Sequence, residues 1–84
     1  MNDSKTSQAP LIDVRTAEEF RKGHIPGAIN IPLDQIDQAD IASGSHLYCR
    51  SGRRSGIARD RLKERGIDTV NLGGIEDYDG PVEK

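Results

Sequence analysis

Residues 46–55 read HLYCRSGRRS, a short apolar run followed by a cysteine, a glycine and three arginines. The run His46–Tyr48 predicts a buried strand. A helix is predicted to follow through Arg65, because Gly66 suits the position just after a helix end. A strand that leads through a tight loop into a helix is typical of parallel α/β sheets. The pattern therefore places Cys49 at the carboxyl end of a strand, where ligands bind in such sheets.

The rest of the chain supplies the other elements of such a sheet. Thr16 and Glu19 are spaced as a capping box, which predicts a short helix that turns Phe20 inward and stops at Gly23. Further strands are predicted at residues 10–14, 28–31 and 68–72, single helical turns at 32–38 and 75–78, and a turn at 73–74. We therefore expect an α/β fold with a mainly parallel sheet of about four strands and helices on its faces.

The loop after Cys49 has three features that lower the pKa of a thiol. The predicted helix presents its N-terminus, with a positive dipole end and unpaired N–H groups. Arginines follow within a few residues, and Gly52 lets the backbone turn several N–H groups toward one anion. This arrangement favours nucleophilic catalysis on an anionic substrate. Two alternatives stay open, namely a buried inert cysteine and an anion-binding loop in which Cys49 takes no part.

The charge of the chain is concentrated in the segment 49–65. Seven basic residues stand there against two acidic ones, so the segment carries +5 and the remainder −7, which gives the net charge of −2. The predicted helix turns Ile57, Ala58 and Leu62 toward the core and leaves its basic residues to solvent. A basic segment inside an acidic chain with only three aromatic residues indicates a local anion site, not a nucleic-acid surface.

Length and composition bound the remaining possibilities. The chain has 84 residues, enough for one domain, which we place at 10–84 behind a flexible tail at 1–9. It has no apolar run long enough to span a membrane and no signal-peptide pattern, so we expect a cytoplasmic protein, with a chain that has lost an export signal as the alternative. A single cysteine excludes an internal disulfide and a cysteine-based zinc site.

Several motifs together resemble those of the rhodanese family. They are LIDVR at 11–15, EF at 19–20, GHIPGAINIP at 23–32, CRSGRRS at 49–55 and LGG at 72–74. The resemblance covers about residues 10–80 and is closest to the small, single-domain phage-shock type. It implies a three-layer α/β/α fold that lacks the N-terminal strand and helix of larger members. It also implies a sulfurtransferase that needs no cofactor or metal.

The resemblance assigns roles by position. Cys49 matches the cysteine that forms a persulfide. The residues expected to bind the substrate are Arg50, Ser51, Gly52, Arg53, Arg54 and Ser55. Asp13 and Arg15 match an Asp-x-Arg motif, and we expect them either to orient the loop from beside it or to form a surface ion pair of little value. His24 and the turn around it are expected to be structural.

Two further functions compete with the enzyme. The first is a persulfide carrier that delivers sulfur to a protein partner with little turnover of small molecules. The second is phosphatase-like activity, which the loop disfavours because only four residues separate Cys49 from Arg54, whereas the related phosphatases have five. The expected partners are a small anionic sulfur donor and a thiol, cyanide or protein acceptor, with no nucleic acid or membrane. The chain is expected to be a monomer or a weak dimer.

Overall fold

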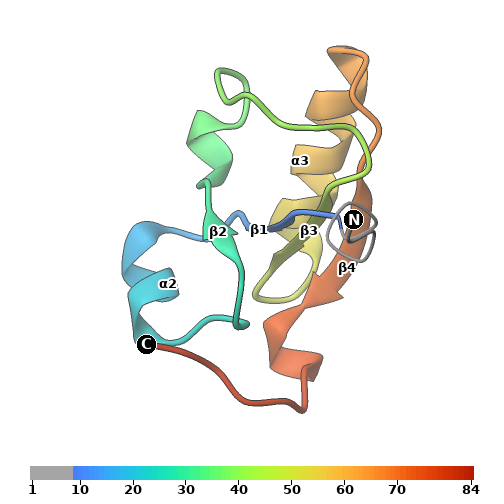
Figure 1. Ribbon diagram of the computed structural model, residues 1–84. Helices are drawn as coiled ribbons and strands as arrows, with labels where there is room; N and C mark the ends of the chain where they lie inside the picture. Colours follow the sequence, from blue (N-terminus) through green and yellow to red (C-terminus); the bar gives the residue numbers. More distant parts are fainter. Residues whose placement is uncertain (1–8) are drawn as a thin grey trace, which may run out of the picture.

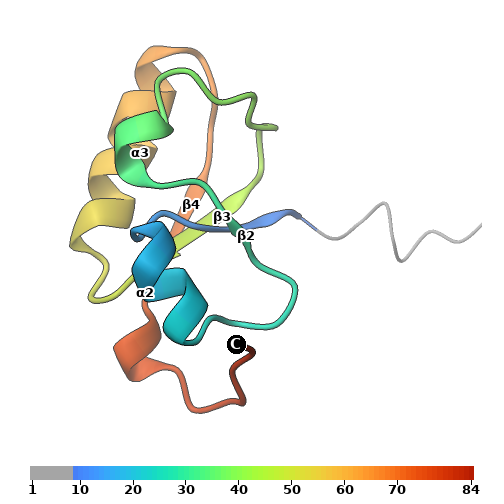
Figure 2. The same ribbon diagram turned by 90° about the vertical axis from the view of Figure 1, so that its left-hand side faces the viewer.

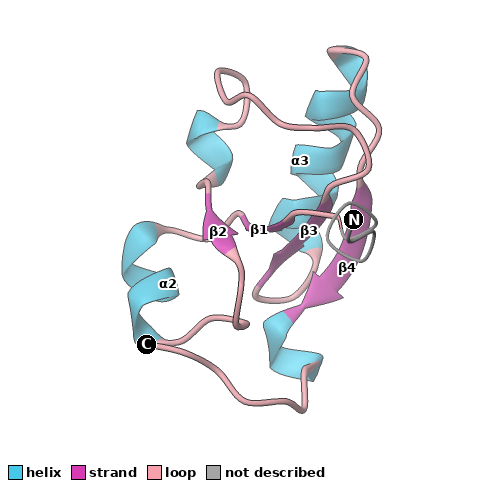
Figure 3. Ribbon diagram, in the orientation of Figure 1, coloured by secondary structure: helices cyan, strands magenta, loops and turns pink. Residues whose placement is uncertain are grey.

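The computed structural model describes residues 9–84, and these contain a single sheet with helices beside it (Figure 1). The predicted tail at 1–9 lies outside the described residues except for Ala9. The elements, coloured by type in Figure 3, are β1 Leu11–Asp13, α2 Ala17–Lys22, β2 Ile29–Asn30, the 3-10 turn η1 Leu33–Gln35, β3 His46–Cys49, α3 Arg53–Glu64, β4 Val70–Gly74 and the 3-10 turn η2 Ile75–Asp77.

The four strands lie in the order β2-β1-β3-β4, and every neighbouring pair is parallel. The central strand β1 pairs Ile12 with Ile29 of β2 and with Leu47 of β3. Parallel strands end at the same edge of a sheet, so the segments after β1 and β3 meet there. The α/β fold with a four-stranded parallel sheet is thereby confirmed.

The hydrophobic core lies between the sheet and the α3–η1 side of the molecule. It contains eight buried residues, namely Ile12, Val14, Ile36, Ile41, Leu47, Cys49, Ala58 and Leu62. Because side chains alternate along a strand, Asp13 and Tyr48 point to the opposite face. The inner face of α3 was predicted with one error, because Ile57 is 43% exposed and Ser55 is the buried residue in its place. A half-exposed Ile57 is compatible with the helix because Ala58 and Leu62 already fill the contact with β3.

Helix α2 begins as the sequence predicts. The Thr16 side chain accepts the N–H of Glu19, and the Glu19 side chain accepts the N–H of Thr16, which completes the capping box. Phe20 is only half buried and stacks on the ring of His24, with 3.7 Å between ring centroids. None of the α2 residues is fully buried, so α2 contributes less to the core than α3 does.

The C-terminal segment closes against the turn that follows α2. His24 and Glu83 exchange two backbone hydrogen bonds, with N···O distances of 2.9 and 2.8 Å. Figures 1 and 2 both show the C-terminus beside α2, at the end of the molecule where β4 finishes. The structural role predicted for the turn around His24 agrees with these contacts.

The last strand differs from its prediction. A strand at 68–72 and a turn at 73–74 were expected, but β4 runs from Val70 to Gly74 and pairs Gly73 with Tyr48 and Gly74 with Cys49. The two glycines extend the strand because the loop after Cys49 packs on their backbone. A Cβ on Gly74 would collide with the carbonyl oxygen of Arg50 and would lie 2.6 Å from Cα of Ser51.

We expect Gly74→Ala to lower the free energy of unfolding by about 2 kcal/mol, because one methyl group must displace the loop backbone. Chemical denaturation monitored by circular dichroism would measure this loss. The control is Leu72→Ala in the same strand, where the side chain is 53% exposed. A cost for Gly74→Ala no greater than that for Leu72→Ala would contradict the proposed close packing.

Candidate active site

Cys49 is the last residue of β3 and is 1% exposed. Its Sγ accepts a hydrogen bond from the backbone N–H of Gly52, with an N···S distance of 3.0 Å. The Ser55 hydroxyl lies 3.5 Å from the same sulfur. The sulfur therefore lies on the floor of a loop that places hydrogen-bond donors around it.

These hydrogen bonds favour the charged form of the sulfur. Burial raises the pKa of Cys49, but the Ser55 hydroxyl and the backbone N–H groups of Ser55, Gly52 and Ser51 stabilise the thiolate, and the net pKa lies below the ordinary value. The sequence also predicted help from nearby arginines. In the structure the groups that contact Sγ are backbone N–H groups and a hydroxyl.

Gly52 gives the loop its shape. Its backbone adopts a left-handed conformation with φ of 102°, and it caps the N-terminus of α3. This conformation is favourable only for glycine, and it aims the Gly52 N–H at the sulfur. A Cβ at this position would also lie 3.2 Å from Cα of Gly73. The glycine is therefore needed both for the turn and for the close approach to β4.

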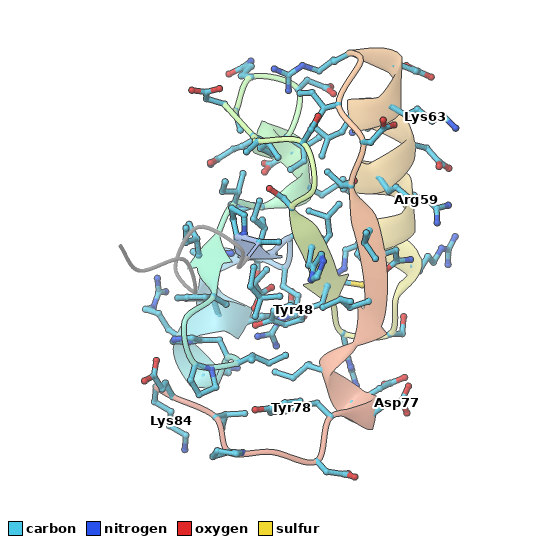
Figure 4. The ribbon with its side chains drawn as sticks, turned by 45° about the vertical axis from the view of Figure 1, so that its right-hand side comes forward. Tyr48, Arg59, Lys63, Asp77, Tyr78 and Lys84 are labelled. Carbon is cyan, nitrogen blue, oxygen red and sulfur yellow. The ribbon has the colours of Figure 1, made fainter. Side chains whose placement is uncertain are left out.

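The three arginines of the loop have different surroundings. Arg50 and Arg53 are exposed, and within residues 9–84 neither forms an ion pair. Arg54 instead donates two hydrogen bonds to the Glu19 carboxylate, at 2.7 and 3.0 Å. Arg54, one of the three arginines that were predicted to bind the substrate, thus connects α3 to α2. Farther along α3, the side chains of Arg59 and Lys63 extend away from the sheet into solvent (Figure 4).

Glu19 was not predicted to belong to the site. The sequence indicated only its role in the capping box, and nothing in the spacing to Arg54, 35 residues away, indicated the contact. The hydrogen bond from Arg54 lowers the pKa of Glu19 to about 2, and the backbone and hydroxyl of Thr16 add to the effect. One carboxylate therefore caps α2 and holds the loop arginine.

Asp13 and Arg15 form a buried pair, so the alternative of a surface ion pair is wrong. Asp13 is 0% exposed, and the Arg15 Nη2 lies 2.7 Å from its Oδ2. Arg15 also donates to the carbonyl of Gly23 and lies over the Tyr48 ring, 5.8 Å from its centroid. The Tyr48 hydroxyl accepts the N–H of Ile25, and burial raises the pKa of Tyr48 to about 12. The pair therefore supports the turn 23–25 and the residue before Cys49, and among residues 9–84 it makes no hydrogen bond to the loop itself.

Asn71 is a second residue that the sequence reasoning missed. It lies in β4 opposite Leu47, on the side of the sheet that faces α3. Its Nδ2 donates to the carbonyl of Gly52, and its Oδ1 lies 2.6 Å from the Ser55 hydroxyl. A polar residue on the buried face of a strand was the available signal, because such a group needs a partner inside the protein.

The described residues show neither a metal site nor a membrane-spanning helix. Between residues 9 and 84, no group of three His, Cys, Asp or Glu side chains is arranged to hold a metal ion. No helix in this part of the chain is both long and apolar enough to cross a membrane. Cys49 is a free thiol.

Comparison with known families agrees with this geometry. The rhodanese-like domain family matches residues 1–80. The chain belongs to the rhodanese-like domain family. The resemblance seen in the five sequence motifs is thereby confirmed, and the parallel sheet with a cysteine loop before α3 is the rhodanese arrangement.

Relatives of this rhodanese-like domain have names that refer to sulfur transfer. The thiosulfate sulfurtransferase PspE of Escherichia coli is 39% identical over 80 residues, which cover 87% of this chain and 77% of PspE. YrkF of Bacillus subtilis, whose name proposes a sulfur-carrier role, is 35% identical, and the match spans only 43% of its length. A solved structure described as a rhodanese with anions from E. coli has a TM-score of 0.81 at 36% identity and covers 92% of this chain and 99% of its own.

The Glu19–Arg54 contact of this rhodanese-like domain predicts a pH-dependent stability. Because the folded-state pKa of Glu19 is depressed from 4.5 to about 2, the contact stabilises the fold above pH 4.5 and is lost as the pH falls toward 2. Glu19→Gln should therefore lower the free energy of unfolding at pH 7 by about 1 kcal/mol, a value that allows for partial exposure to solvent. Urea unfolding at pH 7 and at pH 3 should show the difference shrinking at the lower pH.

Glu18→Gln is the matched control for this measurement. Glu18 belongs to the same helical turn, but its contact with Lys22 is 3.9 Å long and both side chains are about three-quarters exposed. Its substitution should change stability little at either pH. An equal effect of the two substitutions would show that helix charge, and not the Arg54 contact, is responsible.

Proposed function

We propose that this rhodanese-like domain transfers a sulfane sulfur from thiosulfate, or a related anionic donor, to a thiophilic acceptor such as cyanide or a thiol, through a persulfide on Cys49. The observation that carries the proposal is the Cys49 sulfur itself, buried at a strand end with a depressed pKa and hydrogen-bonded by the loop. A thiol with these contacts forms the nucleophilic thiolate more readily than an ordinary cysteine does. A buried cysteine with no chemical role would not need hydrogen-bond donors around its sulfur.

The reaction divides into two steps that conserve charge. The Cys49 thiolate attacks the outer sulfur of thiosulfate, a sulfur–sulfur bond forms to Sγ, and the bond to the sulfonate sulfur breaks as sulfite leaves with its electron pair. The negative charge then resides on the terminal sulfur of the persulfide. A nucleophilic acceptor attacks that sulfur, the bond to Sγ breaks, and the thiolate is restored.

The loop supplies groups for each stage. The backbone N–H groups that stabilise the thiolate surround the position where the persulfide would lie, so Ser51, Gly52 and Ser55 are proposed to hold the charged sulfur. Arg50 and Arg53 are exposed beside it and are proposed to bind the sulfonate group of the donor. Arg54 is proposed to keep the loop in place through Glu19. Asp13 and Arg15 are proposed to support the strand ends from below.

A persulfide carrier is the second candidate function. The name of YrkF favours it, since that relative is 35% identical over 79 residues. A carrier uses the same Cys49 persulfide but passes the sulfur to a protein, so it shows slow turnover with cyanide. The two functions therefore differ in the second step and share the first.

The mass of the intact protein after incubation with thiosulfate tests the shared step. The wild-type protein should gain one sulfur atom, and Cys49→Ser should gain none. Added cyanide should remove the extra sulfur and release thiocyanate. Rapid catalytic release supports the enzyme, and stable loading with slow release supports the carrier. A Cys49→Ser protein that transfers sulfur at the wild-type rate would exclude both.

Arg50→Ala tests the donor site. Because Arg50 is exposed and free of an ion pair within residues 9–84, its loss should weaken thiosulfate binding and leave the thiol intact. We expect KM for thiosulfate to rise about three- to tenfold with a smaller change in kcat, as for the loss of one partly solvated charged contact. Arg59→Ala removes an equal charge from the outer side of α3 and should leave KM nearly unchanged. Equal effects of the two variants would indicate long-range attraction in place of a binding contact.

A further inference from the structure

The Ser55 hydroxyl has more acceptors around it than it has hydrogens. Its Oγ lies 2.6 Å from Oδ1 of Asn71, 3.2 Å from the carbonyl oxygen of Gly52 and 3.5 Å from Sγ of Cys49. A serine hydroxyl has one hydrogen to donate. Ser55 is 0% exposed, so solvent does not compete for that hydrogen. The direction in which the hydroxyl points therefore decides whether the sulfur has this donor.

The orientation of the Asn71 amide is fixed by the backbone. The N–H of Gly73 lies 3.0 Å from one amide atom, which must be the acceptor Oδ1. The other amide atom lies 3.1 Å from the carbonyl of Gly52 and must be the donor Nδ2. A flipped amide would place a donor against a donor and an acceptor against an acceptor. Ser55 consequently faces an atom that can only accept.

We propose that Asn71 is a positioning residue that holds the Ser55 hydrogen while the Cys49 sulfur is uncharged and releases it to the sulfur when the thiolate forms. Only the hydrogen moves, by rotation about the Cβ–Oγ bond of serine. The heavy atoms that it joins are already within hydrogen-bond distance in the structure.

The two steps of sulfur transfer would use this rotation in opposite directions. In the persulfide the negative charge lies on the terminal sulfur, so Sγ is a weaker acceptor than Oδ1 of Asn71. The Ser55 hydroxyl then donates to Asn71 again. When the acceptor attacks, charge returns to Sγ and the hydroxyl turns back to it. Competition from Asn71 also limits how strongly the thiolate is stabilised, and a thiolate that is stabilised less is a stronger nucleophile.

Charged groups near the sulfur also affect the thiol pKa, and their effect must be distinguished from that of the Ser55 hydroxyl. Arg54 of α3 interacts electrostatically with Cys49, which helps to raise the pKa of Arg54, and its side chain is bound to Glu19. The exposed Arg50 and Arg53 extend from the loop. Replacing Asn71 or Ser55 removes none of these three charges. A change in the thiol pKa that requires both Asn71 and Ser55 therefore reports on the hydroxyl.

A double-mutant cycle on the free thiol tests the inference. The rate of alkylation of Cys49 by iodoacetamide, measured across pH, gives the thiol pKa for the wild type, Asn71→Leu, Ser55→Ala and the double variant. Loss of Asn71 frees the hydrogen for the thiolate, so the pKa of Cys49 should fall, and the thiolate fraction at a pH below it should rise about fivefold, the equivalent of one ordinary hydrogen bond. Ser55→Ala should raise the pKa, and in that background Asn71→Leu should change the thiolate fraction by less than about twofold.

Controls separate this effect from a general disturbance of β4. Val70→Ala removes an exposed side chain from the opposite face of the same strand and should leave the thiol pKa unchanged. Thermal unfolding by circular dichroism verifies that each variant is folded, and Asn71→Val, which suits a strand, replaces Asn71→Leu if the latter is not. A higher pKa in the Asn71 variants, or an effect of equal size with and without Ser55, would overturn the inference.

The inference rests on Cys49 being the reactive group of the proposed function, but its test measures only the thiol. The Asn71 substitution could change the thiol pKa only when Ser55 is present, in a protein that gains no sulfur from thiosulfate. That result would support the inference and would contradict thiosulfate as the sulfur donor. A protein that forms the persulfide but shows no Ser55-dependent effect of Asn71 would refute the inference alone.

Discussion

An almost completely buried sulfur whose pKa lies below its ordinary value is the feature on which the rest of this structure depends. Burial alone favours the neutral thiol. The thiolate is stabilised because four donors of a single loop point at it, three of them backbone N–H groups. Those donors are in place only if the loop turns sharply after β3 and enters α3 at once. The left-handed backbone of Gly52 makes that turn possible.

The neighbouring elements hold the loop from three sides. β4 lies against it, with Gly74 permitting direct contact between backbones and Asn71 binding the Gly52 carbonyl. α2 holds it from the side through the ion pair between Glu19 and Arg54. The buried pair of Asp13 and Arg15 acts at a greater distance, by fixing the turn that receives the Tyr48 hydroxyl. Residues far apart in sequence thus converge on a loop of six residues.

Local patterns predicted the parts of the structure that local interactions determine. The capping box at Thr16, the strand that leads into Cys49 and the helix that ends just before Gly66 each depend on neighbours within a few residues, and each is present. The strand β4 was misplaced because its two glycines suggested a turn, whereas Gly73, with a positive φ of 104°, and the extended Gly74 both pair with β3, and the loop packs against them. Glu19 and Asn71 were missed for the same reason, since their partners lie 35 and 16 to 19 residues away.

Main chain and side chains have different roles in the loop, and this difference affects how proteins with this fold can diversify. The floor of the loop is made almost entirely of backbone, and the side chains of Arg50, Ser51 and Arg53 are exposed at its rim. These three positions can accept other chemistries without disturbing the core or the sulfur. Under the proposed function, a change of donor or acceptor would require substitutions only at this rim, while the sulfur stays where the fold places it. The backbone would then fix reactivity, and the exposed side chains would set recognition.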